Sequence, residues 1–239
     1  MTRLFEPIGC KVDLSTGAMG NATGSYQKRF RDLDGLYADA AAFEAMRATW
    51  GERIVYEVSE FRPTEQSGDL IFGVTRMAPG KVGDEYFMTR GHIHKQADRP
   101  EIYYGQKGHG VMLMESPEGE VRIVPVDAQT VCYVPPFWIH RSINVGKDDL
   151  VMLFCYPADS GQDYEIIARS GGMRSRVVAG DGGWKQVDNP DWRPRDAKLI
   201  SALYGQRSGA GMKASVEIAA SLRTVAAVLR AMEIREIGK

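Results

Sequence analysis

Three things are scarce in this chain of 239 residues: cysteine, an excess of charge of either sign, and long apolar runs. Its three cysteines, Cys10, Cys132 and Cys155, are too few and too far apart for a disulfide framework or a Cys-x-x-Cys metal clamp. Cys132 and Cys155 fall within apolar runs, so we expect them to be small buried residues in a reduced protein.

The charge balance and the apolar pattern exclude several classes of protein. Lys and Arg total 30 against 31 Asp and Glu, a formal net charge of −1, which excludes a strongly basic nucleic-acid-binding surface. No run reaches the roughly 20 apolar residues of a membrane span. Residues 1–12 carry charges and lack the apolar stretch of a secretory signal. We therefore expect a cytoplasmic protein that binds neither nucleic acid nor membrane.

The middle of the chain consists of short β-branched and aromatic runs separated by Gly- and Pro-containing turns. Such runs at intervals of about 8–12 residues predict an antiparallel all-β barrel or jelly roll rather than βαβ units. The expected strands are 53–58, 69–74, 86–89, 101–104, 110–114, 121–124, 130–134, 139–143 and 150–155.

The part of the chain before these strands has little apolar periodicity. Residues 11–35 are polar and rich in Gly, Ser, Thr and Asp, so we expect extended or irregular chain there. Asp39 is a suitable N-cap for a short helix over 40–49, and Gly51 marks its end.

A second helical segment follows Pro194, which divides the chain into a domain at 1–194 and a helical extension at 195–239. Residues 213–235 contain no Pro or Gly, and their apolar residues step by four and three, a seam of about two heptads. This helix packs either on its own barrel or on a second copy of the chain, and its length does not decide between them. The seam residues are Ile218, Leu222, Val225, Leu229 and Met232.

Three of the four histidines form one pattern with a carboxylate. In a strand, His92 and His94 would share a face; Glu101 opens the next expected strand, and His140 begins a later one. Three imidazoles and one carboxylate suit a divalent transition metal and not Ca²⁺. The combination disfavours the alternative that these are ordinary surface histidines. His109, between two glycines, is expected in a turn.

Four segments resemble the cupin-type phosphoglucose isomerases: 89–94 (TRGHIH), 133–141 (YVPPFWIHR), 156–159 (YPAD) and 187–190 (VDNP). The resemblance covers roughly residues 12–194 and implies a cupin jelly-roll barrel with a short N-terminal helix, to which this chain adds the C-terminal helix. It also implies a homodimer that interconverts glucose 6-phosphate and fructose 6-phosphate in glycolysis and gluconeogenesis, through an enediolate or a metal-assisted hydride shift.

The resemblance also implies roles for individual residues. One divalent transition metal per subunit would be bound by His92, His94, Glu101 and His140, with Fe²⁺ favoured over Mn²⁺, Zn²⁺ or Ni²⁺. Glu101 would also serve as the base. Tyr103 and Tyr164 would contact the sugar. The phosphate would be held by neutral donors from Tyr56, Thr75, Thr89, Gly91 and Tyr156.

One position departs from the family. Where archaeal members have a histidine, this chain has Gln162, which can form hydrogen bonds with a substrate but cannot titrate near neutrality. Alternative functions are therefore a cupin that acts on another sugar phosphate, a metal-dependent oxygenase built on the same ligand set, and a non-catalytic sugar-phosphate-binding cupin.

Overall fold

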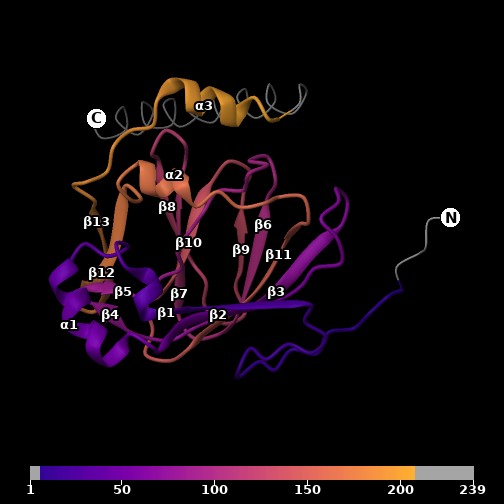
Figure 1. The fold of residues 1–239 in the computed structure, drawn as a ribbon, viewed down its shortest axis with the longest axis horizontal. Helices are drawn as coiled ribbons and strands as arrows, with labels where there is room; N and C mark the ends of the chain where they lie inside the picture. Colours follow the sequence, from indigo (N-terminus) through magenta and orange to yellow (C-terminus); the bar gives the residue numbers. More distant parts are fainter. Residues whose placement is uncertain (1–5, 208–239) are drawn as a thin grey trace, which may run out of the picture.

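A computed structural model describes residues 6–207, which form a barrel of antiparallel strands (Figure 1). Its sheets have the orders β1-β2-β3-β11-β6-β9, β10-β7-β8 and β13-β12-β5-β4. The predicted all-β class is confirmed. The strands are β1 (Gly24–Arg29), β2 (Ile54–Phe61), β3 (Leu70–Met77), β4 (Lys81–Val82), β5 (Glu85–Tyr86), β6 (Glu101–Lys107), β7 (Gly110–Glu115), β8 (Val121–Pro125), β9 (Val131–Val134), β10 (Ile139–Asn144), β11 (Leu150–Pro157), β12 (Ser175–Gly180) and β13 (Gly183–Asp188).

Side-chain alternation distinguishes the two faces of the large sheet. In β6, Glu101 and Tyr103 are buried, whereas the intervening Ile102 and Tyr104 are 40% and 36% exposed. The pleat of a strand sends alternate side chains to opposite faces, so Glu101 and Tyr103 point into the barrel. Every residue of β7 and β10 is buried, because these strands are covered on both faces.

The predicted N-terminal helix is confirmed as α1 (Ala40–Trp50). The Asp39 side chain accepts a hydrogen bond from the backbone N–H of Ala42, and Gly51 is the C-cap. Phe43 is buried and stacks on Phe30 with ring centroids 4.5 Å apart. In Figure 1, α1 lies beside β4 and β5, at the edge of the barrel.

Four predictions for local structure were wrong or incomplete. The polar stretch 11–35 contains strand β1 and a 3₁₀ helix, η1 (Phe30–Leu33). As an edge strand, β1 pairs only with β2, so it needs few apolar residues. The expected strand 86–89 is interrupted: β5 ends at Tyr86, and Met88 forms an isolated bridge to Ile143. The hairpin β12–β13 was missed because β13 is polar and mostly exposed, and the five-residue α2 (Glu165–Arg169) was missed because it is too short to show periodicity.

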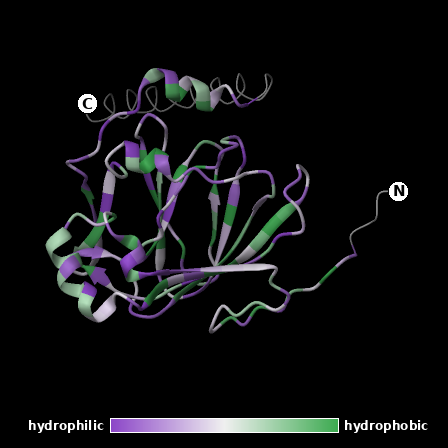
Figure 2. Ribbon diagram, viewed as in Figure 1, coloured by the Kyte–Doolittle hydropathy of each residue, from purple (hydrophilic) through white to green (hydrophobic). Residues whose placement is uncertain are grey.

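The chain beyond residue 194 returns to the barrel. Helix α3 (Ala197–Tyr204) lies across one end of the barrel in Figure 1 and carries both hydrophobic and hydrophilic residues in Figure 2. Arg195 forms a fully buried ion pair with Glu115, Nη1 to Oε1 at 2.6 Å, and Tyr204 packs edge-on against Phe137. The helix expected over 213–235, with its heptad seam, lies outside the described residues.

Two further observations concern the expectations from composition. Cys132 is fully buried, as expected, whereas Cys155 is only partly buried and Cys10 lies in the N-terminal segment. Within residues 6–207, none of the helices has the length and apolar character that crossing a bilayer requires.

Candidate functional site

The segment that carries His92 and His94 is held between two neighbours rather than within a regular strand. His92 pairs with His140 of β10, with both backbone hydrogen bonds formed (3.0 and 2.9 Å), and Ile93 pairs with Asp163. These two bridges keep the chain locally extended. His92 and His94 therefore still point to one side, as the sequence predicted, while Ile93 is buried on the other side.

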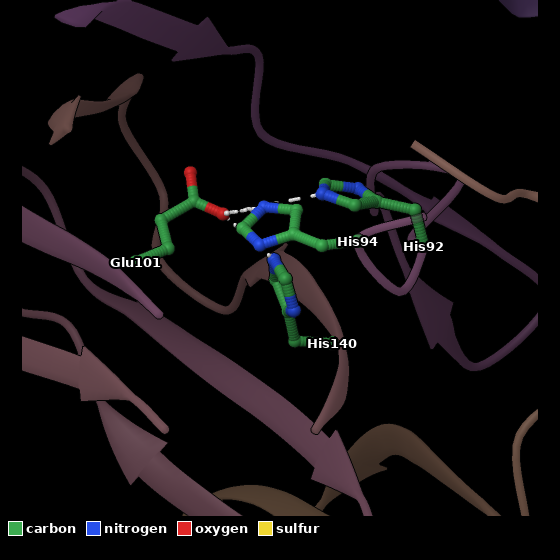
Figure 3. A group of neighbouring side chains, drawn as sticks. All are labelled: His92, His94, Glu101 and His140. Carbon is green, nitrogen blue, oxygen red and sulfur yellow. Dashed lines mark hydrogen bonds and ion pairs between the residues drawn. The ribbon is translucent and has the colours of Figure 1, made fainter. Parts of the chain in front are cut away.

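The four predicted ligands converge in the barrel (Figure 3). Oε2 of Glu101 lies 3.0 Å from Nε2 of His140, 3.3 Å from Nε2 of His94 and 3.9 Å from Nε2 of His92. One ligand atom from each of the four residues lies within 4.8 Å of the others, and all four residues are buried. Side chains from three separate parts of the chain thus surround a space of the size that one cation requires.

The hydrogen bonds around the cluster leave the Nε2 atoms available as metal ligands. Nδ1 of His94 lies 2.8 Å from the carbonyl oxygen of Arg99, and Nδ1 of His140 lies 3.1 Å from that of Trp138. A carbonyl accepts only from a protonated Nδ1, which leaves a lone pair on Nε2. Among the described residues, Nε2 of His92 and of His94 is buried without a hydrogen-bond partner. A divalent transition metal fits this donor set and satisfies these atoms.

Burial and mutual charge shift the pKa values of the cluster. The pKa of His92 lies well below its ordinary value because of burial and the neighbouring His140. Although burial by itself raises the pKa of Glu101, its close contacts with His140 and His94 hold that pKa well below its usual range. Burial lowers the pKa of His94, but the contact with Glu101 outweighs it and raises that pKa. Glu101 is therefore a carboxylate and His92 a neutral imidazole near pH 7.

A cavity of about 210 Å³ opens beside the ligand cluster. One wall is the inner face of the six-stranded sheet, where the registers Val58↔Thr75, Thr75↔Met152 and Phe154↔Tyr103 place side chains of four strands on the same side. The predicted residues that line this wall are Tyr56, Thr75, Glu101, Tyr103 and Tyr156.

The opposite wall comes from β10 and from the loops next to it. It contains Thr89, Gly91, His92, His140, Gln162 and Tyr164. The structure therefore brings every predicted site residue to this one cavity except His94, which lies in the ligand cluster without lining the cavity.

Gly91 is required by its backbone conformation and by its surroundings. Its φ is +74°, and a Cβ at this position would lie 2.9 Å from the carbonyl oxygen of His140 and 2.9 Å from Cβ of Arg141. A larger residue is strained in both respects. The close approach of the two backbones allows His92 to pair with His140.

Tyrosine hydroxyls of the cavity remain protonated donors. Burial raises the pKa of Tyr56 to about 12 and that of Tyr103 well above its usual value, the latter with a contribution from Glu101. Burial also raises the pKa values of Tyr156 and Tyr164. The Tyr164 hydroxyl donates to Oε1 of Gln162, so these two side chains act as a pair.

The sequence prediction missed three cations of the cavity, Arg62, Arg90 and Arg141. Arg62 is paired with Glu60, Nη2 to Oε1 at 3.1 Å. Arg90 forms no ion pair within residues 6–207. In the sequence it lies between Thr89 and Gly91. Strict strand alternation would place Arg90 on the opposite side from Thr89, so the sequence does not indicate that both residues line this cavity. No sequence signal indicates Arg62.

Comparison with known proteins gives concordant results. The family model described as glucose-6-phosphate isomerase (GPI) matches residues 27–193. The glucose-6-phosphate isomerase of Sinorhizobium medicae (strain WSM419) is 75% identical over 206 residues, 86% of this chain and 96% of that protein. The glucose-6-phosphate isomerase of Thermococcus litoralis is 44% identical over 189 residues, 79% and 97% of the two chains. Among solved structures, oxalate oxidase in complex with the substrate analogue glycolate is similar at a TM-score of 0.39 and 19% identity, covering 46% of this chain and 55% of that one.

Proposed function

The chain belongs to the cupin-type glucose-6-phosphate isomerase family, and from this premise we propose that it interconverts glucose 6-phosphate and fructose 6-phosphate as a metal-dependent enzyme. The observation that supports this best is the convergence of three histidines and one glutamate beside a cavity lined by hydroxyl donors. The reaction moves a hydrogen between C1 and C2 of the open-chain sugar.

His92, His94, Glu101 and His140 would hold one divalent transition metal per chain. When bound, such a cation supplies Lewis-acid stabilisation of the negative charge that develops on the sugar oxygens. The mixed nitrogen and oxygen donor set accepts Fe²⁺, Mn²⁺, Zn²⁺ and Ni²⁺, of which we propose Fe²⁺.

Glu101 is the proposed base that carries a proton between C1 and C2. It is ionised, it lines the cavity, and it is the only carboxylate of the ligand cluster. Its lowered pKa makes it a weak base, so its strength must come from its position next to the reacting carbons. A hydride shift, which needs no base, is the alternative that the Glu101 variant below distinguishes.

Tyr103 and Tyr164 are proposed to orient the sugar from opposite walls of the cavity. Both phenols are protonated at neutral pH, so each can donate one hydrogen bond to a sugar oxygen. Gln162, hydrogen-bonded to Tyr164, can also bind the sugar, but it cannot carry a proton during ring opening. This difference makes another sugar phosphate the second candidate substrate.

The substrate phosphate is proposed to lie against neutral donors and two nearby cations. Tyr56, Thr75, Thr89, Gly91 and Tyr156 line the cavity and offer hydroxyl and backbone groups. A phosphate dianion that displaces water from these groups gains charge-assisted hydrogen bonds. The positive side chains that line the same cavity and favour a dianion are Arg62, Arg90 and Arg141.

We further propose that the chain is a cytoplasmic homodimer. The family supports the dimer, and the heptad pattern at 213–235 offers one means of pairing. Because Arg195 and Leu203 are buried against the barrel, a chain ending at Arg207 is a better test than one ending at Pro194. A smaller mass of this truncated chain in light scattering supports pairing through the seam, whereas an unchanged dimer mass places the interface elsewhere.

A coupled assay tests the activity directly. Metal-free protein is loaded separately with Fe²⁺, Mn²⁺, Zn²⁺ or Ni²⁺, supplied with fructose 6-phosphate, and followed by formation of glucose 6-phosphate. Turnover with at least one ion is expected, and its absence with all four contradicts the proposal. A panel of other sugar phosphates and a measurement of oxygen uptake identify the alternative enzymes, and binding without turnover identifies a non-catalytic protein.

A further inference from the structure

A second cavity, of about 410 Å³, lies behind the substrate cavity, on the outer face of the three-stranded sheet β10-β7-β8. The register of β10 with β7 separates the two cavities. His140 and Ser142 line the substrate cavity and Ile143 lines the second one, whereas Arg141, between His140 and Ser142, lines both. Its volume lies in the usual range of sites for small molecules.

Arg141 gives this cavity its chemical character. It is 7% exposed and forms no ion pair within the part of the chain that the structure describes. Nη1 donates to Sδ of Met88 and Nη2 to the carbonyl oxygen of Arg90, both at 2.8 Å, and Nε has no partner. Burying a guanidinium with only neutral acceptors is costly, and a bound anion offsets that cost.

The buried charges around Arg141 do not cancel. The Arg176 side chain, 14% exposed, also lines the cavity. It pairs with the buried Glu85, Nη1 to Oε2 at 3.1 Å, and with Asp191, Nη2 to Oδ2 at 3.7 Å. Glu85 also accepts a hydrogen bond from the backbone N–H of Ala38, so its carboxylate already has two partners and does not pair with Arg141. Asp34 and Asp191 line the cavity as exposed residues at its rim. The buried part thus carries two guanidinium groups and one carboxylate.

The two cavities share side chains. Arg90, Arg141 and Tyr164 line both of them. Arg141 also holds the Arg90 carbonyl, directly before Gly91. A ligand beside Arg141 therefore contacts the same segment that we propose binds the substrate phosphate.

We propose that the second cavity binds a small polar dianion, such as a phosphomonoester or a dicarboxylate, and that this ligand changes the affinity of the substrate cavity. The planar guanidinium of Arg141 presents paired N–H groups that suit either phosphate or carboxylate oxygens. Binding itself is independent of the proposed isomerase activity; the effect on substrate affinity rests on it.

Binding is tested by calorimetry of the metal-free full-length chain with inorganic phosphate and with succinate. Ala168 is an exposed lining residue on α2, so Ala168→Trp blocks the cavity without removing a buried contact, and Arg176→Gln removes one of its charges. Both variants are expected to weaken binding of at least one probe ~10-fold or more. Thr89 lines only the substrate cavity, so Thr89→Val should retain binding of the probe in the second cavity. Unchanged binding in Ala168→Trp with a native circular dichroism spectrum overturns the proposal.

Coupling is tested by steady-state kinetics with the probe that binds. Competition inside the substrate cavity affects the wild type and Ala168→Trp equally, so the difference between them isolates the second cavity. We expect the probe to change the KM for fructose 6-phosphate about 5-fold more in the wild type. Equal changes overturn the coupling. Absence of turnover in both, with binding still lost in Ala168→Trp, contradicts the proposed activity and leaves the second site supported.

Discussion

Nε2 of His140 lies 3.0 Å from Oε2 of Glu101, although 38 residues separate the two in the chain. Glu101 begins β6 of the six-stranded sheet and His140 lies in β10 of the three-stranded sheet, so closure of the barrel creates this contact. Both side chains are buried. This contact connects the two walls of the substrate cavity at the ligand cluster. The first two predictions test His140 and Glu101 in turn.

His140→Ala is expected to remove metal and activity together, because it removes one of four ligands and the partner of Glu101. Metal content should fall from about one ion per chain to near zero, and turnover by at least ~100-fold. Elemental analysis and the coupled assay measure the two effects. His109→Ala is the matched control, since His109 is exposed and its Nδ1 lies 3.1 Å from Oδ1 of Asp127, away from the cluster. Full activity of His140→Ala would place the site elsewhere.

Glu101→Gln should retain part of the bound metal but lose turnover ~10²–10⁴-fold, the usual contribution of a general base. The amide keeps the shape and one oxygen ligand but cannot accept the proton. Solvent-isotope incorporation at C1 or C2 during turnover provides the second measurement. Turnover within a few-fold of the wild type, without exchange with solvent, would favour the hydride shift.

Thr89→Val is expected to raise the KM for fructose 6-phosphate ~10-fold or more, since a hydrogen bond to a charged group contributes roughly 1.5–3 kcal/mol. Metal content should not change. The Thr89 hydroxyl also accepts from the backbone N–H of Ser142 at 3.1 Å, so Thr89→Ser, which keeps that bond, is the control. Equal KM values for Val and Ser variants would contradict a role in phosphate binding.

Gln162→His should add an ionisation near pH 6.5 to the profile of kcat/KM, because an imidazole beside Tyr164 can titrate where an amide cannot. The assay is run from pH 5 to 8 with the wild type in parallel. Superimposable profiles would show that position 162 takes no part in proton transfer.

The metal-free protein is expected to lose stability as the pH falls below 6.5. The pKa of His92 is lowered on folding, so below 6.5 the unfolded chain binds a proton that the folded chain does not. The free energy of unfolding therefore decreases with falling pH, by up to about 1.4 kcal/mol per pH unit from this group. Urea titrations of the wild type and His92→Gln measure the difference, and equal slopes would show that His92 is not buried as a neutral imidazole.

Local patterns in the sequence predict much of the fold. The interior strands of the barrel combine β-branched and aromatic residues with turn signals, and α1 has a good N-cap and a terminal glycine. The strands and helices that escaped prediction are those whose own residues show little periodicity: β1 and β13 are polar and α2 is short. Their positions depend on what they pair with.

The four candidate metal ligands could be predicted because histidine is rare in this chain and three of its four histidines share one pattern. The strand expected around His92 and His94 was not found, yet the two bridges that replace it preserve the same side-chain direction. The family resemblance supplied the remaining cavity residues. The roles of those residues stay predictions until the variants are measured.

The order of residues along the chain determined the all-β architecture, the short helix α1 and the identity of the ligand set, because these depend on composition, spacing and local turn chemistry. Only the tertiary structure decided that Arg90 reaches the cavity, that Glu101 is held as a carboxylate, and that Arg141 is buried without a counter-ion among residues 6–207. Those properties arise from contacts between distant segments and from exclusion of water, neither of which is encoded in any single stretch of sequence.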